Sequence, residues 1–221
     1  MSALLLKNGR FVLPDEVTEP QNLLIRDEIV FKIGAEDCGE ESIDVKGGYV
    51  FPGFVDIHIH GGGGADFMDG TAEAFETAVR AHLKRGTTTL VPTAMTATHS
   101  ELVGFINAYH SFKKHSKYSD AAVGLHLEGP YFSNTDKSSK GAQSGNLIRD
   151  ISFAEIAELL DTADGSIIRW DAAKFRTVKN LPKYVRKTIL FARRLIQMPP
   201  PPKHSAALRR DFPISRIFTM R

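Results

Sequence analysis

From residue 51 onward, apolar runs of strand length alternate with longer stretches in which apolar residues recur at helical spacing. Residues 71–86 show the helical spacing most clearly, with Thr71 as a plausible N-cap and Gly86 at the far end. Two further helices are predicted over 99–115 and 152–163. Strands are predicted over the intervening runs, 54–60, 87–95, 121–130 and 166–173. Strands that alternate with helices predict parallel pairing with right-handed crossovers, so this part of the chain is expected to be α/β.

The first fifty residues have a different pattern. Three stretches rich in β-branched and aromatic residues predict short strands, and they lie at 3–13, 22–34 and 42–53. Lys7-Asn8-Gly9 and Lys46-Gly47-Gly48 have the composition of turns. We therefore expect residues 1–50 to form a β-rich module, followed by the βα units of residues 51–173.

The last part of the chain, residues 174–221, breaks this order. Residues 1–171 hold 15 Lys and Arg against 25 Asp and Glu, whereas residues 172–221 hold 13 against the single acid Asp211. One helix is predicted over 185–197, followed by four prolines and a basic tail with no alternation that indicates a strand. One hypothesis is that residues 174–221 come from a shifted reading frame; another is that they form a nucleic-acid-binding arm.

Length and composition place the chain among ordinary globular proteins. Its 221 residues are 42% hydrophobic, and its one cysteine, Cys38, excludes an internal disulfide and fits a reducing compartment. The apolar run at the start is too short for a signal peptide or a membrane helix. We therefore expect a cytoplasmic protein that does not bind membranes.

Candidate chemistry lies where two predicted strands end. In FPGFVDIHIHGGGGADF (51–67), alternation puts His58 and His60 on one face of a strand, directly before four glycines. In GLHLEGPYF (124–132), His126 and Glu128 share a face and Glu128 comes just before Gly-Pro. Parallel strands of a barrel bring such ends to one rim, where two imidazoles and a carboxylate suit zinc or ferrous iron. The alternative is a hydrogen-bonded histidine pair and a solvated glutamate.

Three segments together resemble the N-acetylglucosamine-6-phosphate deacetylases of the amidohydrolase superfamily. They are FPGFVDIHIHGGGGADF, RGTTTLVPTAMT, and GLHLEGPYF followed by KGAQ, and the resemblance covers residues 1 to about 172. It implies a metal-dependent hydrolase, with a small β-sandwich beside the first half of a (β/α)₈ barrel and an atypical C-terminal part. It also implies a homodimer.

The resemblance assigns roles to individual residues. Glu128 matches the main ligand of a divalent metal, and His58 and His60 match the pair that holds a second metal in some members. Ala142 and Gln143 match positions that contact the amino sugar. The implied reaction belongs to amino-sugar catabolism, and it converts N-acetyl-D-glucosamine 6-phosphate into D-glucosamine 6-phosphate and acetate.

The family completes its site with two more histidines and a catalytic aspartate from later strands. After residue 173 this chain has one histidine, His204, and one acidic residue, Asp211. The residues around them do not match the segments in which the family carries its later histidines and its aspartate. We therefore expect a truncated, inactive chain whose catalytic residue is unknown.

Two alternatives stay open. One is another metal-dependent amidohydrolase, such as a dihydroorotase-like cyclic amidase. The other is a non-catalytic protein that binds nucleic acid through its basic tail, although the tail has little aromatic interleaving.

Overall fold

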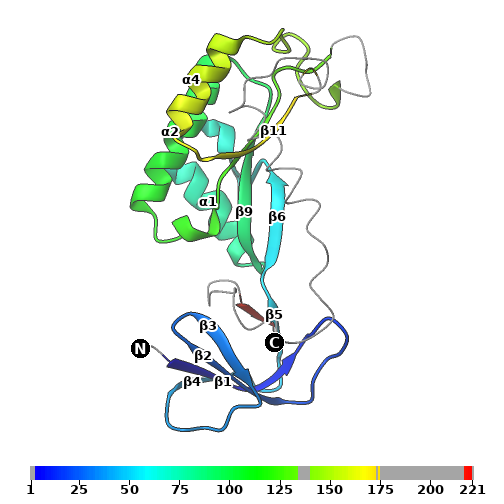
Figure 1. Ribbon diagram of the computed structural model, residues 1–221, viewed down its shortest axis with the longest axis vertical. Helices are drawn as coiled ribbons and strands as arrows, with labels where there is room; N and C mark the ends of the chain where they lie inside the picture. The colour runs from blue at the N-terminus through cyan, green and yellow to red at the C-terminus, as the bar shows by residue number, and fades with distance from the viewer. Residues whose placement is uncertain (1–2, 134–139, 173, 175–216, 221) are drawn as a thin grey trace. The chain divides into compact units, whose positions relative to one another are not determined.

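The structure, a computed structural model, describes residues 3–133, 140–172, 174 and 217–220, which fall into two units (Figure 1). The first unit contains the described residues up to 55, residues 86–88 and the strand at 217–220. The second contains residues 56–85 and the described residues from 89 to 174. The helix predicted over 185–197 and most of the basic tail lie outside the described residues.

The first unit is built on a six-stranded sheet with the order β12-β5-β1-β2-β3, in which β4 also pairs with β1. β1 pairs antiparallel with β2 and parallel with β4 and β5, while β12 pairs antiparallel with β5. Buried apolar residues lie on both sides of this sheet, with Leu6, Leu23 and Ile25 in one cluster and Leu5 and Leu24 in another. The strands are β1 (Ala3–Phe11), β2 (Gln21–Arg26), β3 (Ile29–Ile33), β4 (Glu41–Asp44), β5 (Tyr49–Pro52) and β12 (Ile217–Met220).

Three details of this sheet differ from the sequence pattern. Residues 22–34 form a hairpin, because Asp27 and Glu28 adopt left-handed φ values of 47° and 65° between β2 and β3. Asn8 and Gly9 do not end a strand; the register of β1 against β2 shifts there and the strand continues. The strand β12 lies in the tail, where no strand was predicted.

The second unit contains a four-stranded sheet with the order β11-β10-β9-β6, and β9, β10 and β11 are parallel neighbours. The helices α1, α2 and α4 lie together on one side of it (Figure 1). The expected α/β fold with a parallel sheet is therefore confirmed. The strands are β6 (Phe54–Ile59), β7 (Gly61–Gly62), β8 (Ala65–Asp66), β9 (Thr87–Ala94), β10 (Leu125–Glu128) and β11 (Ile167–Asp171). The helices are η1 (Phe67–Asp69), α1 (Ala72–Leu83), α2 (His99–His115), η2 (Ser119–Ala121) and α4 (Phe153–Ala163).

Each long helix begins at a side-chain cap. The hydroxyls of Thr71, Thr98 and Ser152 accept hydrogen bonds from backbone N–H groups in the first turns of α1, α2 and α4. Thr98 and Glu101 form a reciprocal capping box, which satisfies two N–H groups that the helix itself leaves unpaired. The three helices predicted within residues 51–173 are confirmed. Within the described residues, every helix is too short or too polar to cross a membrane.

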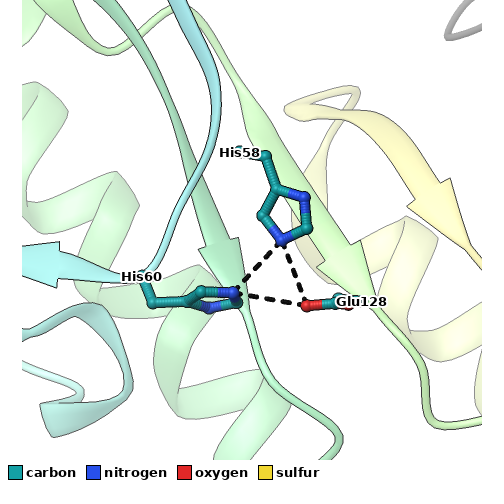
Figure 2. Close-up of side chains that lie close together, drawn as sticks. All are labelled: His58, His60 and Glu128. Carbon is teal, nitrogen blue, oxygen red and sulfur yellow. Dashed lines mark hydrogen bonds and ion pairs between the residues drawn. The ribbon is translucent and has the colours of Figure 1, made fainter. Parts of the chain in front are cut away.

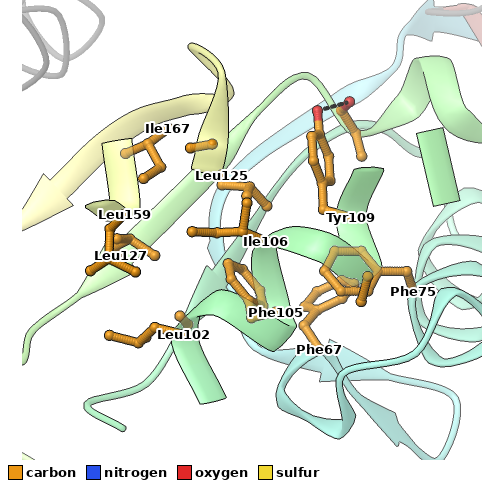
Figure 3. Packing of buried hydrophobic residues seen from close by; sticks show 14 of the residues in the cluster. Phe67, Phe75, Leu102, Phe105, Ile106, Tyr109, Leu125, Leu127, Leu159 and Ile167 are labelled. Atoms are coloured by element: carbon orange, nitrogen blue, oxygen red, sulfur yellow. Dashed lines mark hydrogen bonds between the residues drawn. The ribbon is translucent and has the colours of Figure 1, made fainter. Parts of the chain in front are cut away.

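The core of the second unit fills the space between the sheet and the helices (Figure 3). Phe67, Phe75 and Phe105 are fully buried, and the ring centroids of Phe75 and Phe105 lie 5.5 Å apart. Leu125 and Leu127 of β10 face this core, so the alternating positions 126 and 128 face the other way. Packing of the odd-numbered residues of β10 thus directs the even-numbered ones toward the candidate site.

Replacing Phe105 with Ala should lower the free energy of unfolding by about 3–5 kcal/mol, because the removed ring leaves a cavity in close-packed surroundings. The single tryptophan, Trp170, is 3% exposed in the same core, so its fluorescence during urea denaturation reports this unit. Phe153→Ala is the control, since Phe153 is 45% exposed and should cost less than about 1 kcal/mol. Equal losses in the two variants would contradict the assigned core.

Candidate metal centre

Three potential metal-ligating atoms meet at one edge of the four-stranded sheet (Figure 2). His58 Nε2 lies 3.2 Å from His60 Nε2 and 3.2 Å from Glu128 Oε2, and His60 Nε2 lies 3.3 Å from the same carboxylate oxygen. All three side chains are partly exposed, so an ion in solution can reach them. The structure therefore brings together the three residues that the sequence singled out.

These three side chains come from strands that are not adjacent. β9 lies between β6 and β10, and neighbouring strands are about 4.8 Å apart, so the donors reach across about 10 Å of sheet. His58 and His60 share a face because they are two residues apart along an extended chain. Glu128 ends β10, since Gly129 turns the chain with a φ of 94° and Pro130 has no N–H for the ladder.

The donor set fits a divalent ion. Ligands that lie about 2.0–2.2 Å from a tetrahedral zinc ion are about 3.3–3.6 Å from one another, and the observed separations are 3.2–3.3 Å. Two imidazoles and one carboxylate are the ligand types of zinc and ferrous iron sites. The three donor atoms lie close enough together to bind one ion.

His60 is held in the orientation that such a site needs. Its Nδ1 lies 3.1 Å from the backbone carbonyl oxygen of Thr93 on β9, an acceptor that requires the proton to be on Nδ1. In the neutral ring the Nε2 atom then carries the lone pair, and this atom faces the cluster. Histidines that bind metals are commonly fixed in this way by a backbone carbonyl.

His126 and Asp171 form a second layer beside the cluster, and the sequence pattern had assigned neither of them a role in the site. The His126 ring is fully buried and meets the His58 ring edge to face, with centroids 4.8 Å apart. His126 Nε2 lies 3.2 Å from Asp171 Oδ2, without the alignment of a hydrogen bond. Two features of the sequence could have pointed to this second layer. His126 shares a strand face with Glu128, and Asp171 stands at the end of the next strand, β11.

Burial affects this second layer electrostatically. It lowers the pKa of His126, against the opposing effect of the nearby Asp171 carboxylate, and so favours the neutral imidazole. Burial on its own would raise the pKa of Asp171, but contacts with His126 and Arg169 outweigh it and hold that pKa well below its usual range. Asp171 is therefore an anion beside the cluster.

Ala142 and Gln143, the predicted sugar-contacting residues, lie on a segment that follows the undescribed residues 134–139. Ala142 is exposed, whereas Gln143 is only 4% exposed. The Gln143 Oε1 atom accepts a hydrogen bond of 2.8 Å from the backbone N–H of Thr96, and its Nε2 lies 3.8 Å from Met95 Sδ. The Gln143 amide is thus engaged inside the protein.

Arg149 anchors this segment. Its Nη1 donates to the carbonyl oxygen of Ala97 at 2.7 Å, and its Nε and Nη2 both donate to the carboxylate of Glu155 on α4. Tyr131 also donates to Glu155, at 2.8 Å. Burial tends to raise the pKa of Glu155, but the hydrogen bonds from Arg149 and Tyr131 prevail and lower it.

Comparison with known proteins agrees with this architecture. Residues 49–176, more than half of the chain, match the sequence profile described as the amidohydrolase family. The chain therefore belongs to the amidohydrolase family, whose members are metal-dependent hydrolases. It is 30% identical over 155 residues to the N-acetylglucosamine-6-phosphate deacetylase of Haemophilus influenzae, a match that covers 70% of this chain and 39% of that protein.

Solved structures give the same result. The N-acetylglucosamine-6-phosphate deacetylase of Pasteurella multocida matches with a TM-score of 0.71 and 26% identity, over 85% of this chain and 49% of that one. A variant of the Mycobacterium smegmatis enzyme, in complex with N-acetyl-D-glucosamine-6-phosphate, matches with a TM-score of 0.63 and 30% identity, over 78% and 44% of the two chains. The resemblance to this group is confirmed for the N-terminal part, and the chain spans less than half the length of these relatives.

Glu155→Gln should destabilise the second unit by about 2 kcal/mol near pH 7, because it weakens charge-assisted hydrogen bonds from Arg149. A carboxyl whose pKa is lowered by folding stabilises the protein above its unfolded pKa, and that stabilisation disappears as pH falls through the folded pKa. The difference from the unmodified protein should thus be fully present above about 4.3, the ordinary value for glutamate, and shrink as pH falls below it. His99 Nδ1, 3.4 Å from Glu155 Oε1, adds to the attraction wherever His99 is charged.

Urea denaturation at a series of pH values, followed by Trp170 fluorescence, measures this difference. Glu158→Gln is the matched control, because Glu158 lies one turn along the same helix, its side chain is 63% exposed, and its carboxylate also faces His99, at 3.0 Å. A difference for Glu155→Gln that stayed constant down to pH 3 would contradict the role of the ionised carboxylate.

Proposed function

We propose that the described residues form the metal-binding part of a site that hydrolyses N-acetyl-D-glucosamine 6-phosphate to D-glucosamine 6-phosphate and acetate. The observation that carries this proposal is the convergence of His58, His60 and Glu128 within a fold similar to deacetylases of that name. One relative, from Escherichia coli, is instead named N-acetylgalactosamine-6-phosphate deacetylase and is 28% identical over 109 residues, so both amino-sugar phosphates are candidate substrates.

In this proposal His58 and His60 supply neutral Nε2 lone pairs and Glu128 supplies a carboxylate oxygen to one divalent ion, zinc or iron. When bound, such an ion would polarise the acetamide carbonyl and make water a stronger nucleophile. Thr93 keeps His60 directed at the ion position through its carbonyl oxygen. Ala142, which is exposed, and Gln143 would border the amino sugar.

Amide hydrolysis also requires a proton for the leaving amine, and a positioned acid or base contributes about 10²–10⁴ to the rate of such a step. Glu128 cannot carry this proton while its carboxylate holds an ion. The family resemblance assigns the step to an aspartate on a later strand, beyond the part of the fold that the described residues form. We therefore expect the site to bind metal without completing the reaction on its own.

Zinc binding tests the ligand assignment. The protein should bind zinc at one site by isothermal titration calorimetry, and prolonged dialysis against a chelator should remove the ion, because three ligands hold it less firmly than a closed structural site. Glu128→Gln should weaken binding by about 100-fold or more, since loss of even an outer-shell partner costs about 10–100-fold. Glu158→Gln should bind like the unmodified protein. Zinc that survived chelator dialysis, or unchanged affinity in Glu128→Gln, would contradict the assignment.

Acetate release tests the reaction. The 221-residue chain with added zinc or iron should release no acetate from N-acetylglucosamine 6-phosphate, because the aspartate that the resemblance assigns to proton transfer has no counterpart in the described residues. A version in which residues from 174 onward are replaced by the C-terminal half of the Haemophilus influenzae relative should show metal-dependent release. Glu128→Gln in that version should abolish it, and the galactosamine epimer serves as the comparison substrate. Turnover by the unmodified chain that Glu128→Gln removed would show that it needs no further residues.

A further inference from the structure

Gln143 is joined to the metal-binding residue Glu128 through a single intervening residue, Thr96. The Oε1 atom of Gln143 accepts the backbone N–H of Thr96 at 2.8 Å. The hydroxyl of Thr96 in turn donates to the carbonyl oxygen of Glu128 at 3.3 Å. Two hydrogen bonds thus connect a side chain 15 residues away with the end of strand β10.

The surroundings make this connection stiff. Gln143 is 4% exposed and Thr96 is 5% exposed, so water does not compete readily for either bond. A Cβ atom on Gly129 would lie 2.0 Å from Thr96 Oγ1, which shows how closely Thr96 packs against the residue after Glu128. On the opposite side, Gly129 donates to Asp171 and its carbonyl oxygen accepts the Trp170 indole N–H at 2.7 Å.

The position of Glu128 depends on this packing because β10 ends there. The pairing of β10 with β9 ends at Leu127 and Ala94, so on the β9 side the backbone of Glu128 is held by the hydroxyl of Thr96. Thr96 itself lies in the loop between β9 and α2, where its N–H would be a buried, unpaired donor without Gln143. A buried donor left unpaired is costly, so the loop would move to satisfy it.

We propose that Gln143 is a positioning residue, which fixes Thr96 and, through it, the carboxylate of Glu128 at the metal site. This proposal rests on the proposed metal-binding function and adds a role inside the protein to a residue otherwise expected at the sugar. Arg149 supports it by holding the segment that carries Gln143 to the carbonyl oxygen of Ala97, next to Thr96.

Zinc affinity measured by calorimetry on the full chain tests the proposal. Gln143→Met keeps the length of the side chain but removes the acceptor, and should weaken zinc binding about tenfold, at the lower end of the effect of outer-shell partners. Gln143→Glu keeps an acceptor oxygen and should restore affinity to within about threefold. Thr96→Val should weaken binding similarly, and the two changes together should not add, because they break one connection.

Phe105→Ala is the control for a merely structural role, because it destabilises the same unit without touching this connection. It should leave zinc affinity unchanged, while Gln143→Met changes it. Equal affinity in Gln143→Met and the unmodified protein, or an equal loss in Phe105→Ala, would overturn the proposal. If Gln143→Met failed to fold, the affinity of Thr96→Val would decide it.

A metal-free measurement separates this proposal from the function on which it rests. The backbone amide resonances of Glu128 and Gly129 should shift in Gln143→Met and return in Gln143→Glu, and the Thr96 amide should exchange faster with solvent in the Met variant. If the unmodified protein bound no zinc, the proposed function would fail while these resonances still tested the positioning role. Unshifted resonances would overturn that role whether or not zinc binds.

Discussion

The buried side chain of Thr93 is the point on which the arrangement of the metal site depends. Its hydroxyl accepts the N–H of Ile59 on β6 at 3.0 Å and lies 3.2 Å from His126 Nδ1 on β10, while its carbonyl oxygen meets His60 Nδ1. One residue of β9 thereby makes polar contacts with both flanking strands. Because Thr93 is completely buried, its hydroxyl and its carbonyl oxygen cannot exchange these partners for water without cost.

Much of the second unit could be predicted from sequence, because local signals agreed with one another. Thr71 was expected to be an N-cap and is the N-cap of α1, and the helix over 99–115 has the predicted bounds. His58, His60 and Glu128 could be grouped because strand alternation and the shared edge of parallel strands are general rules. Their actual separations depend on the width of one strand, β9, which alternation does not specify.

Other features carried no usable local signal. The turn at Asp27 and Glu28 has left-handed backbone at two acidic residues, where glycine or asparagine is the usual signature. The internal role of Gln143 depends on Thr96, 47 residues earlier, and a hydrogen bond over that distance leaves no periodic trace. Likewise β12, near the C-terminal end of the chain, pairs with β5 near residue 50. Whether such a segment forms a strand depends on the strand it pairs with more than on its own pattern of apolar and polar residues.

The span of the His58–Glu128 pair links metal binding to folding. These residues are 70 positions apart in the chain and come from strands on opposite sides of β9. An ion held between them would act as a cross-link that exists only when β6, β9 and β10 are assembled in order. Its binding free energy would then be added to the stability of the sheet, by about 2.7 kcal/mol at a free concentration 100 times the dissociation constant. The free metal concentration would, in that case, set the fraction of molecules in which this sheet is assembled.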